Sequence, residues 1–514
     1  MGNEKEKDVL YNKLQRHISD ATQQSSYVLL GKIFGLVFGF LVSTILAKYY
    51  GSKIMGQYTI VKTIVNIAVI FTVFGLDNGI VKYVSRFRTL NKKEKYLNII
   101  KTSLILATIF SVLISMLIFY FRSLIANNIF NDSELINSIS YGAWIIIPLT
   151  FIKIFGGIYR AFKNLKYYII SNEIIRRAGL LILLIILYFL NIKSSVYVIL
   201  SMLAIYIIVF IYLAFNVKNI SLNIFNVVFS KNFFPDKKLT KELLSYSSTL
   251  IFISFMLYIL SKIDKLMLGY FTSSSIVGIY SIATLLATLV TFVLSSSNMI
   301  FSSIVSELFS QNNIDLLNKI YSLITKWLII LTLPIALNMI IFPKVILSFF
   351  GSEYIIASTT LIILVISQMI NVFVGGNGQI LSMCGYENIL LINNSLMVII
   401  NILLNIILIP NYGMLGAAIA TGVSIASINL IKVIQLKYYL NIFPYNRNYF
   451  FIILLITMIV INSFLFKLIY NHLFIVVLTT IINYIISLFL IHKYSTDMDL
   501  IIFKAIKENL LLRS

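Results

Sequence analysis

The sequence predicts an all-α polytopic membrane protein with fourteen transmembrane helices, and three observations carry that prediction. Of its 514 residues, 59% are hydrophobic and only 12% are charged, whereas soluble chains hold about 45–50% apolar and about 25% charged residues. The mean hydropathy is +0.94. The apolar residues also form continuous runs near the roughly 20 residues that a helix needs to cross the hydrocarbon core. Strands of a membrane barrel would alternate in hydrophobicity over about ten residues, so a barrel is excluded.

The expected spans follow one another along the whole chain and are joined by short loops. They cover residues 27–47, 59–76, 97–121, 135–158, 174–190, 195–216, 246–269, 276–300, 323–342, 354–380, 389–409, 414–431, 450–466 and 472–491. The first 26 residues are polar, and no small-residue cleavage site follows a short apolar core. We therefore expect the first span to stay in the protein and not to be removed as a signal peptide.

The distribution of Lys and Arg predicts the orientation of these spans. With the N-terminus inside, the predicted cytosolic segments hold 26 Lys and Arg residues and the outer segments hold 6. Positive residues accumulate on the cytosolic side of membrane proteins. We therefore expect a multi-pass protein of the cytoplasmic membrane with both termini in the cytosol.

An internal repeat predicts how the spans are grouped. A shift of 222 residues places Gly56-Gln57-Tyr58 on Gly278-Ile279-Tyr280, and Asn172 on Asn394. Six spans in each copy give both copies the same orientation, as in parallel transporter repeats. The repeat also extends the seventh span through the charged cluster at 261–265, which hydropathy alone would leave outside. The expected parts are a cytosolic N-terminal tail (1–26), an N-lobe of six helices (27–216), a cytosolic linker (217–245), a C-lobe of six helices (246–431), two extra C-terminal helices with their preceding loop (432–491) and a cytosolic amphipathic tail (492–514).

The composition excludes several functional classes. The formal net charge of +22 could indicate a nucleic-acid partner, but so apolar a chain has too little polar surface to build a basic face, so no nucleic acid is expected. The single cysteine, Cys384, allows neither a disulfide framework nor a thiolate metal site. The histidines, His17, His472 and His492, are too far apart to form a ligand set. Acids are few and scattered, so we expect no enzyme activity, cofactor or metal.

Charged residues inside the predicted spans are the candidates for function, because each costs about 2.5–3.5 kcal/mol at the bilayer centre. Lys101 and Lys326 lie near cytosolic ends, where they can snorkel to the surface. Arg176 and Arg177 are adjacent and cannot share one helix face, so one of them is expected to point inward. The residues expected to line an internal, water-filled cavity are Lys32, Lys62, Lys153, Arg177, Lys262, Asp264 and Lys265. We expect Asp264 to partner a neighbouring lysine and the mostly positive cavity to accept a phosphate or pyrophosphate.

Three polar or small-residue patterns have two interpretations each. Lys32, Gly35, Gly39 and Ser43 share one helix face, which forms either a tight helix contact or a cavity wall. We favour the cavity wall, because a lysine is poorly tolerated in a tight contact. Two further patterns suit either sugar hydroxyls or interhelical hydrogen bonds: Thr284, Thr288, Thr291 and Ser295 in the eighth span, and Gln368, Asn371, Asn377 and Gln379 in the tenth.

Several segments together resemble a known family. The run from Lys262 to Phe271, followed by Val277 to Ser281, forms a charged motif with a Gly-Ile-Tyr element behind it. It is similar to the central motif of the polysaccharide flippase (Wzx-type) branch of the multidrug/oligosaccharidyl-lipid/polysaccharide (MOP) exporter superfamily. The run from Leu46 to Tyr58 resembles that family's first-loop pattern. Residues 405–410 and 412–421 resemble its twelfth-span signature.

The resemblance implies a MOP/MATE-like fold of two six-helix repeats and two extra helices. It also implies transbilayer flipping of a polyprenyl-(pyro)phosphate-linked oligosaccharide by alternating access, for cell-surface polysaccharide or glycan synthesis. Such a protein would act as a monomer in the lipid bilayer, with a coupling ion (H⁺ or Na⁺) and with a glycan polymerase or glycosyltransferases as partners.

Other functions remain open at this point. A MATE-type drug/cation antiporter would need more acids in the cavity, and a lipid II flippase would share both the cationic cavity and the fold. A membrane-embedded glycan polymerase or ligase would need large outer loops, and the predicted outer loops are short.

Overall fold

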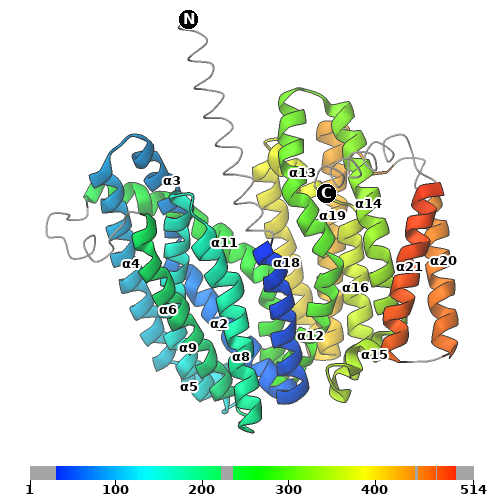
Figure 1. Cartoon of the computed structure of the whole chain (residues 1–514), viewed down its shortest axis with the longest axis horizontal. Helices are drawn as coiled ribbons and strands as arrows, with labels where there is room; N and C mark the ends of the chain where they lie inside the picture. Colours follow the sequence, from blue (N-terminus) through cyan, green and yellow to red (C-terminus); the bar gives the residue numbers. More distant parts are fainter. Residues whose placement is uncertain (1–29, 221–235, 446–449, 470–471, 494–514) are drawn as a thin grey trace, which may run out of the picture. The chain divides into compact units, whose positions relative to one another are not determined.

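The protein is all-helical throughout the part that the structure describes (Figure 1). The computed structural model describes residues 30–220, 236–445, 450–469 and 472–493. The predicted cytosolic tails (1–26 and most of 492–514) and residues 221–235 of the predicted linker lie outside these residues. Within them, eleven helices are long and apolar enough to cross a membrane. The all-α membrane class is therefore confirmed, whereas the count of fourteen spans stays a prediction.

The chain divides into two compact units, which we describe separately. Unit 1 comprises Met1–Tyr258 with Ser273–Ser275, and unit 2 comprises Ile259–Thr272 with Ile276–Ser514. The helix α11 (Lys237–Phe271) therefore contributes its first part to unit 1 and its second part to unit 2. The boundaries of the predicted lobes stay predictions.

Unit 1 contains a first helix over residues 30–45 and a series of helices that follow it. These are η1 (Leu46–Tyr50), α2 (Gly51–Val73), α3 (Leu76–Thr89), α4 (Lys93–Tyr120), α5 (Arg122–Leu124), η2 (Ile125–Ile129), α6 (Leu135–Ala161), α7 (Lys166–Ile169), η3 (Ile170–Ile175), α8 (Arg176–Phe189), α9 (Ser195–Asn216) and η4 (Val217–Ile220).

The helix α6 is the centre of unit 1, because it contacts α2, α3, α4 and α9. Small residues allow this close packing. A Cβ on Gly142 would lie 2.5 Å from Val61 Cγ1 of α2, and one on Gly157 would lie 2.5 Å from the Asp77 carbonyl oxygen of α3. At the corner between α2 and α3, Gly75 has φ +69° and lies directly against the Ser247 carbonyl of α11. Glycine is needed there both for the left-handed backbone and for space.

Unit 2 contains the rest of α11 and all later helices. These are α12 (Ser274–Val290), whose first residues belong to unit 1, α13 (Phe292–Ser310), α14 (Ile314–Ile341), α15 (Pro343–Ser348), η5 (Ser352–Ala357), α16 (Ser358–Phe373), α17 (Asn377–Met383), α18 (Glu387–Tyr412), α19 (Met414–Leu440), α20 (Phe450–Ile469) and α21 (Leu473–Lys493).

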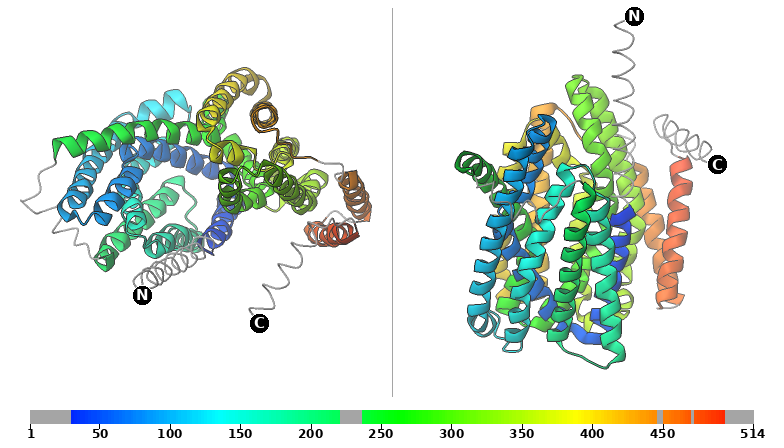
Figure 2. Two further views of the ribbon diagram at one scale, coloured as in Figure 1. Left: turned by 90° about the horizontal axis from the view of Figure 1, so that it is seen from above. Right: turned by 60° about the vertical axis from the view of Figure 1, so that its left-hand side comes forward.

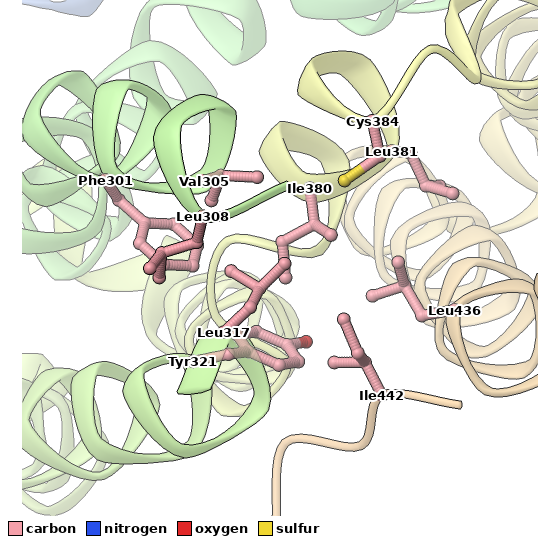
Figure 3. Close-up of a cluster of buried hydrophobic side chains, with 10 residues drawn as sticks. All are labelled: Phe301, Val305, Leu308, Leu317, Tyr321, Ile380, Leu381, Cys384, Leu436 and Ile442. Carbon is pink, nitrogen blue, oxygen red and sulfur yellow. The ribbon is translucent and has the colours of Figure 1, made fainter. Parts of the chain in front are cut away.

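The helix α19 plays the corresponding central part in unit 2, where it contacts α16, α17 and α18. Its glycines bring it close to both main neighbours. A Cβ on Gly416 would overlap the Leu408 carbonyl oxygen of α18, and one on Gly422 would lie 2.5 Å from Ser367 Oγ of α16. At one end of unit 2, a buried apolar cluster joins α13, α14, α17 and α19 (Figure 3). This cluster contains Phe301, Tyr321 and the protein's single cysteine, Cys384.

The last two helices of unit 2 lie side by side and pack against α14 (orange and red in Figure 2). Their contact with α14 includes a buried polar seam. The Asn338 side chain accepts a hydrogen bond from Ser463 Oγ of α20 at 2.8 Å and donates one to Thr480 Oγ1 of α21 at 2.8 Å. Asn483 Nδ2 donates to Ser463 Oγ at 2.9 Å. Asn338, Ser463 and Asn483 are buried, so these groups satisfy one another where lipid offers no partner.

Candidate functional site

Three cations of unit 1 form one electrostatic group. Lys62 is an exposed residue of α2, and its Nζ donates to the Tyr58 hydroxyl at 3.1 Å and lies 5.0 Å from the centre of that ring. Arg176 and Arg177 of α8 are both close enough to act on the charge of Lys62, as is Tyr206 of α9. The structure therefore brings two of the predicted site residues, Lys62 and Arg177, together with Arg176.

The two adjacent arginines have different surroundings. Arg177 pairs with Glu173, one turn earlier, with 2.9 Å between Nη2 and Oε2, and its Nη1 donates to the Gly35 carbonyl of the first helix. Arg176 instead donates from Nε to the Asn172 carbonyl at 3.0 Å and from Nη1 to the Tyr206 hydroxyl at 3.4 Å. Glu173 lies within the helical segment η3, although the sequence predicted it at the end of a cytosolic loop.

The glycine face of the first helix is a tight helix contact, so the cavity-wall interpretation of Gly35 and Gly39 is wrong. A Cβ on Gly35 would lie 3.1 Å from Arg177 Cζ and would overlap a Glu173 carboxylate oxygen, and one on Gly39 would lie 3.0 Å from Arg177 Nη1. The glycines make room for the ion pair of the neighbouring helix. The lysine that argued against such packing, Lys32, is itself exposed.

The remaining predicted cations lie on three helices. Lys32 is exposed on the first helix and Lys153 is exposed on α6, both in unit 1. Lys262 and Lys265 are half-buried on the part of α11 that belongs to unit 2. The helix runs without interruption through residues 261–265, as the internal repeat predicts.

Asp264 is the centre of a second polar group, which lies wholly within unit 2. Its carboxylate accepts hydrogen bonds from Asn405 Nδ2 of α18 at 2.7 Å, from the Tyr280 hydroxyl of α12 at 3.2 Å and from Thr421 Oγ1 of α19. These three partners are uncharged, and the lysine partner that the sequence predicted for Asp264 stays a prediction. The half-buried carboxylate thus joins α11 to three other helices.

The residues that bond to the Asp264 carboxylate also bring further oxygen atoms close to it, from an amide and from hydroxyl groups. Asn405 Nδ2 also donates to Asn401 Oδ1 at 3.0 Å. The other amide atom, Asn405 Oδ1, is buried and has no hydrogen-bond partner in the structure. A buried acceptor without a donor is unusual, and a small cation coordinated by carboxylate, amide and hydroxyl oxygens would satisfy it. No group of three or more His, Cys, Asp or Glu residues that could hold a metal occurs among the described residues.

Two of the four amides that the sequence singled out in the tenth span bond to another helix. Asn377 Nδ2 donates to Asn429 Oδ1 of α19 at 3.1 Å, and Asn429 Nδ2 donates to Asn371 Oδ1 at 2.8 Å. This chain bridges the break between α16 and α17 and favours the interhelical interpretation for Asn371 and Asn377. The hydroxyls of the eighth-span stripe each donate to a carbonyl one turn earlier on their own chain segment. Their oxygen lone pairs can still accept hydrogen bonds.

Sequence reasoning missed most partners of the two polar groups. Tyr58 and Tyr206 were not distinguishable from the chain's 31 tyrosines. Asn405 and Thr421 do lie in the segments that resemble the twelfth-span signature, and that resemblance was the one available signal for them. Nothing in the local sequence connects either residue to Asp264.

Comparison with known proteins places the chain among membrane exporters. Residues 21–305 match the family model described as polysaccharide biosynthesis protein, and residues 250–407 match the MatE model. An uncharacterized membrane protein of Methanocaldococcus jannaschii is 25% identical over 432 residues, which cover 78% of this chain and 81% of that protein. The "Probable low-salt glycan biosynthesis flippase Agl15" of Haloferax volcanii is 30% identical over 219 residues, which cover 41% of this chain and 46% of that protein.

Solved structures show the same fold. The lipid II flippase MurJ in an inward closed conformation has a TM-score of 0.69 and 16% identity, covering 90% of this chain and 97% of that one. A multidrug resistance MATE family transporter of the MOP superfamily, in an inward-facing conformation, has a TM-score of 0.66 and 14% identity. The match covers 79% of this chain and 94% of that one. At such identities the likeness concerns the fold alone, and it confirms the predicted MOP/MATE-like class.

Proposed function

The chain belongs to the polysaccharide biosynthesis protein family, and from this membership we propose that it flips a polyprenyl-(pyro)phosphate-linked oligosaccharide across the membrane. The relatives named as flippases in glycan biosynthesis support this substrate class. The intact cargo crosses the bilayer and no bond in it is made or broken, so the protein acts as a transporter and not as an enzyme. It alternates between two conformations that open to opposite sides.

The observation that carries this proposal is the surplus positive charge of the group in unit 1. Lys62 lies within reach of the charges of Arg176 and Arg177 there, and Glu173 is the acid that acts on the two arginines within the described residues. Charges at membrane depth are costly unless they are paired, and an anionic cargo supplies the missing partner during transport. Lys32, Lys153, Lys262 and Lys265 are the further cations that we propose contact the cargo along its path.

We also propose that the group around Asp264 holds the coupling ion, and that this ion is Na⁺. Its carboxylate, amide and hydroxyl oxygens are the ligand types that hard cations prefer. The buried Asn405 Oδ1, which has no hydrogen-bond partner, would become a ligand. H⁺ is the other candidate, and it would act by protonating Asp264 itself.

Flipping can be measured in proteoliposomes that contain a fluorescent polyprenyl-diphosphate oligosaccharide and a membrane-impermeant quencher. The wild-type protein should make nearly all of the fluorophore accessible, and the rate should rise with a Na⁺ gradient. Lys32→Ala, Lys62→Gln and Asp264→Ala should each lower the rate at least tenfold. Lys193→Gln, which changes an exposed lysine in the turn after α8, serves as the matched control. Wild-type rates in all three cavity variants would refute the proposed residues.

The same vesicles distinguish the alternative functions. A MATE-type antiporter would export a fluorescent organic cation and ignore the lipid-linked oligosaccharide. A lipid II flippase would prefer lipid II in direct competition with an oligosaccharide that lacks a peptide. The cationic group of unit 1 argues against the first alternative, because it would repel a cationic drug.

The setting that we propose follows from the charge distribution and from the substrate class. The protein lies in the cytoplasmic membrane with both termini in the cytosol, since Lys and Arg concentrate in the segments assigned to that side. It works as a monomer. Glycosyltransferases build the cargo before it is flipped, and a glycan polymerase or further transferases use it afterwards.

A further inference from the structure

The two adjacent arginines of α8 carry the same charge but differ in what remains available to a ligand. Successive residues of an α-helix point about 100° apart, so Arg176 and Arg177 face different neighbours. Arg177 uses Nη2 for Glu173 and Nη1 for the Gly35 carbonyl, and Gly39 closes against it. Its guanidinium therefore packs the first helix against α8.

Arg176 is held by the protein through two of its three guanidinium nitrogens. Its Nε and Nη1 bond to the Asn172 carbonyl and to the Tyr206 hydroxyl. No hydrogen bond to its Nη2 is recorded among the residues that the structure describes. Two of its three nitrogens are thus held by the protein, which orients the planar guanidinium, while the third, Nη2, is available to a ligand.

The acid of this group is already engaged. Glu173 Oε2 pairs with Arg177 at 2.9 Å, and Glu173 Oε1 accepts a hydrogen bond from Asn172 Nδ2 at 2.8 Å. Both carboxylate oxygens are therefore occupied by groups other than Arg176 and Lys62. Arg176 and Lys62 therefore make no direct contact with this carboxylate, although its charge still acts on Arg176.

Two buried phenols complete the set of donors. Tyr58 accepts from Lys62 and Tyr206 accepts from Arg176, and both rings are less than 6% exposed. A hydroxyl that accepts from a cation keeps its own proton for donation. Arg176, Lys62, Tyr58 and Tyr206 thus offer only hydrogen-bond donors and positive charge, which suits the several oxygens of a diphosphate.

We propose that Arg176, together with Lys62, Tyr58 and Tyr206, binds the diphosphate of the cargo, whereas Arg177 serves helix packing. This inference rests on the proposed flippase function for the identity of the cargo. The anion itself is recognised by the chemistry of the four side chains. Sequence spacing could not show which of the two arginines binds the anion. The ion pair of Glu173 with Arg177 indicates that Arg176 is the one.

Titration calorimetry of the purified full-length protein with inorganic pyrophosphate tests the assignment. Arg176→Gln and Lys62→Gln should each raise Kd at least tenfold. Arg177→Gln should lower the melting temperature and raise Kd by a smaller factor than Arg176→Gln does, because it removes a nearby charge but no hydrogen bond to the anion. Arg122→Gln on α5 is the control, since Arg122 bonds to its own segment at Phe119. Its Kd should equal that of the wild type.

Three results would overturn the inference. They are a wild-type protein that binds no pyrophosphate, an Arg176→Gln variant with wild-type Kd, and an Arg177→Gln variant that loses as much affinity as Arg176→Gln at an unchanged melting temperature. The flipping assay separates this inference from the proposed function. Pyrophosphate binding through Arg176 without flipping of the oligosaccharide would reject the function and keep the site. Wild-type flipping by Arg176→Gln would reject the site and keep the function.

Discussion

Glu173 contacts two neighbouring side chains, Arg177 and Asn172, and the contribution of each contact to stability can be measured with single substitutions. Its carboxylate fixes Arg177 against the first helix and holds Asn172, whose carbonyl in turn orients Arg176. Glu173 therefore fixes the position of Arg177 directly, whereas Arg176 is oriented by a backbone carbonyl of its own helical segment. The side chains of the ion pair are 30% and 19% exposed, so water screens the interaction only in part.

Replacing Glu173 by Gln should destabilise the protein, because it leaves the Arg177 charge without its acid. The expected loss is about 1–2 kcal/mol, between the values for exposed and buried pairs. In a double-mutant cycle, adding Arg177→Gln should cost less than it does alone, with a coupling energy of about 1 kcal/mol. Thermal unfolding can be followed with a thiol-reactive dye, since the single cysteine is buried. Strict additivity would contradict the pairing.

The partners of Asp264 show the limit of sequence reasoning at this scale. Asp264 was recognisable as the lone acid in a predicted span, but Asn405 and Thr421 lie 141 and 157 residues further along the chain. Periodicity reports neighbours on one helix, at separations of three or four residues. Contacts between helices depend on how the helices pack, so proximity in the sequence could suggest a lysine of the same helix as a partner of Asp264 but not these distant residues.

At the level of helices, glycines at helix contacts, here called glycine seams, determine how closely neighbouring helices approach one another. Gly157→Ala and Gly416→Ala would each place a methyl group within 2.5 Å of a carbonyl oxygen on a neighbouring helix, at Asp77 and Leu408 respectively. Backbone cannot move aside as a flexible side chain can, so each variant should lose about 1–3 kcal/mol. The same dye-monitored unfolding measures this loss.

Gly378→Ala provides the matched control for these two variants. Its added Cβ would lie no closer than 3.8 Å to any neighbouring atom, which is an ordinary contact. Alanine also has the higher helix propensity. This variant should unfold at or slightly above the wild-type temperature, and equal losses in all three would show that the seams are not close packed.

The polar seam between α14 and the last two helices gives a separate prediction. Asn338→Leu keeps the side chain's size but removes the acceptor of Ser463 and the donor to Thr480. Leaving buried polar groups without partners costs about 1–3 kcal/mol, which a lower unfolding temperature should reveal. Asn411→Leu is the control, because the exposed Asn411 bonds only to its own helix at Ile407. Similar losses in both variants would argue against the seam.

Element boundaries were predictable where charge or repetition marked them. The internal repeat predicted that the seventh span includes residues 261–265, and the helix α11 does continue through them. The eighth and tenth predicted spans were continuous, whereas the structure interrupts them at Thr291 and near Gly375. Hydropathy averages over many residues, so a local change of backbone direction inside an apolar run leaves no signal in it.

For the molecule as a whole, the sequence established the class because composition is a global property. The orientation is a separate expectation and can be tested directly. In a Cys384→Ser background, single cysteines replace the exposed Lys93 and Lys193, which are predicted to lie inside and outside. A membrane-impermeant maleimide on intact cells should label only Lys193→Cys. Labelling of Lys93→Cys alone would reverse the topology.

The seam at Asn338 also bears on how the protein is made. Helices enter the membrane in the order of translation, so α14 arrives well before α20 and α21 are synthesised. Until then, the amide of Asn338 lacks the Ser463 and Thr480 hydroxyls that later satisfy it. A chain that has not yet reached α20 therefore carries a polar amide within the bilayer that lacks these two partners, which is energetically costly. Synthesis of α20 and α21 then supplies the missing partners, so the Asn338 amide is satisfied only after these helices have entered the membrane.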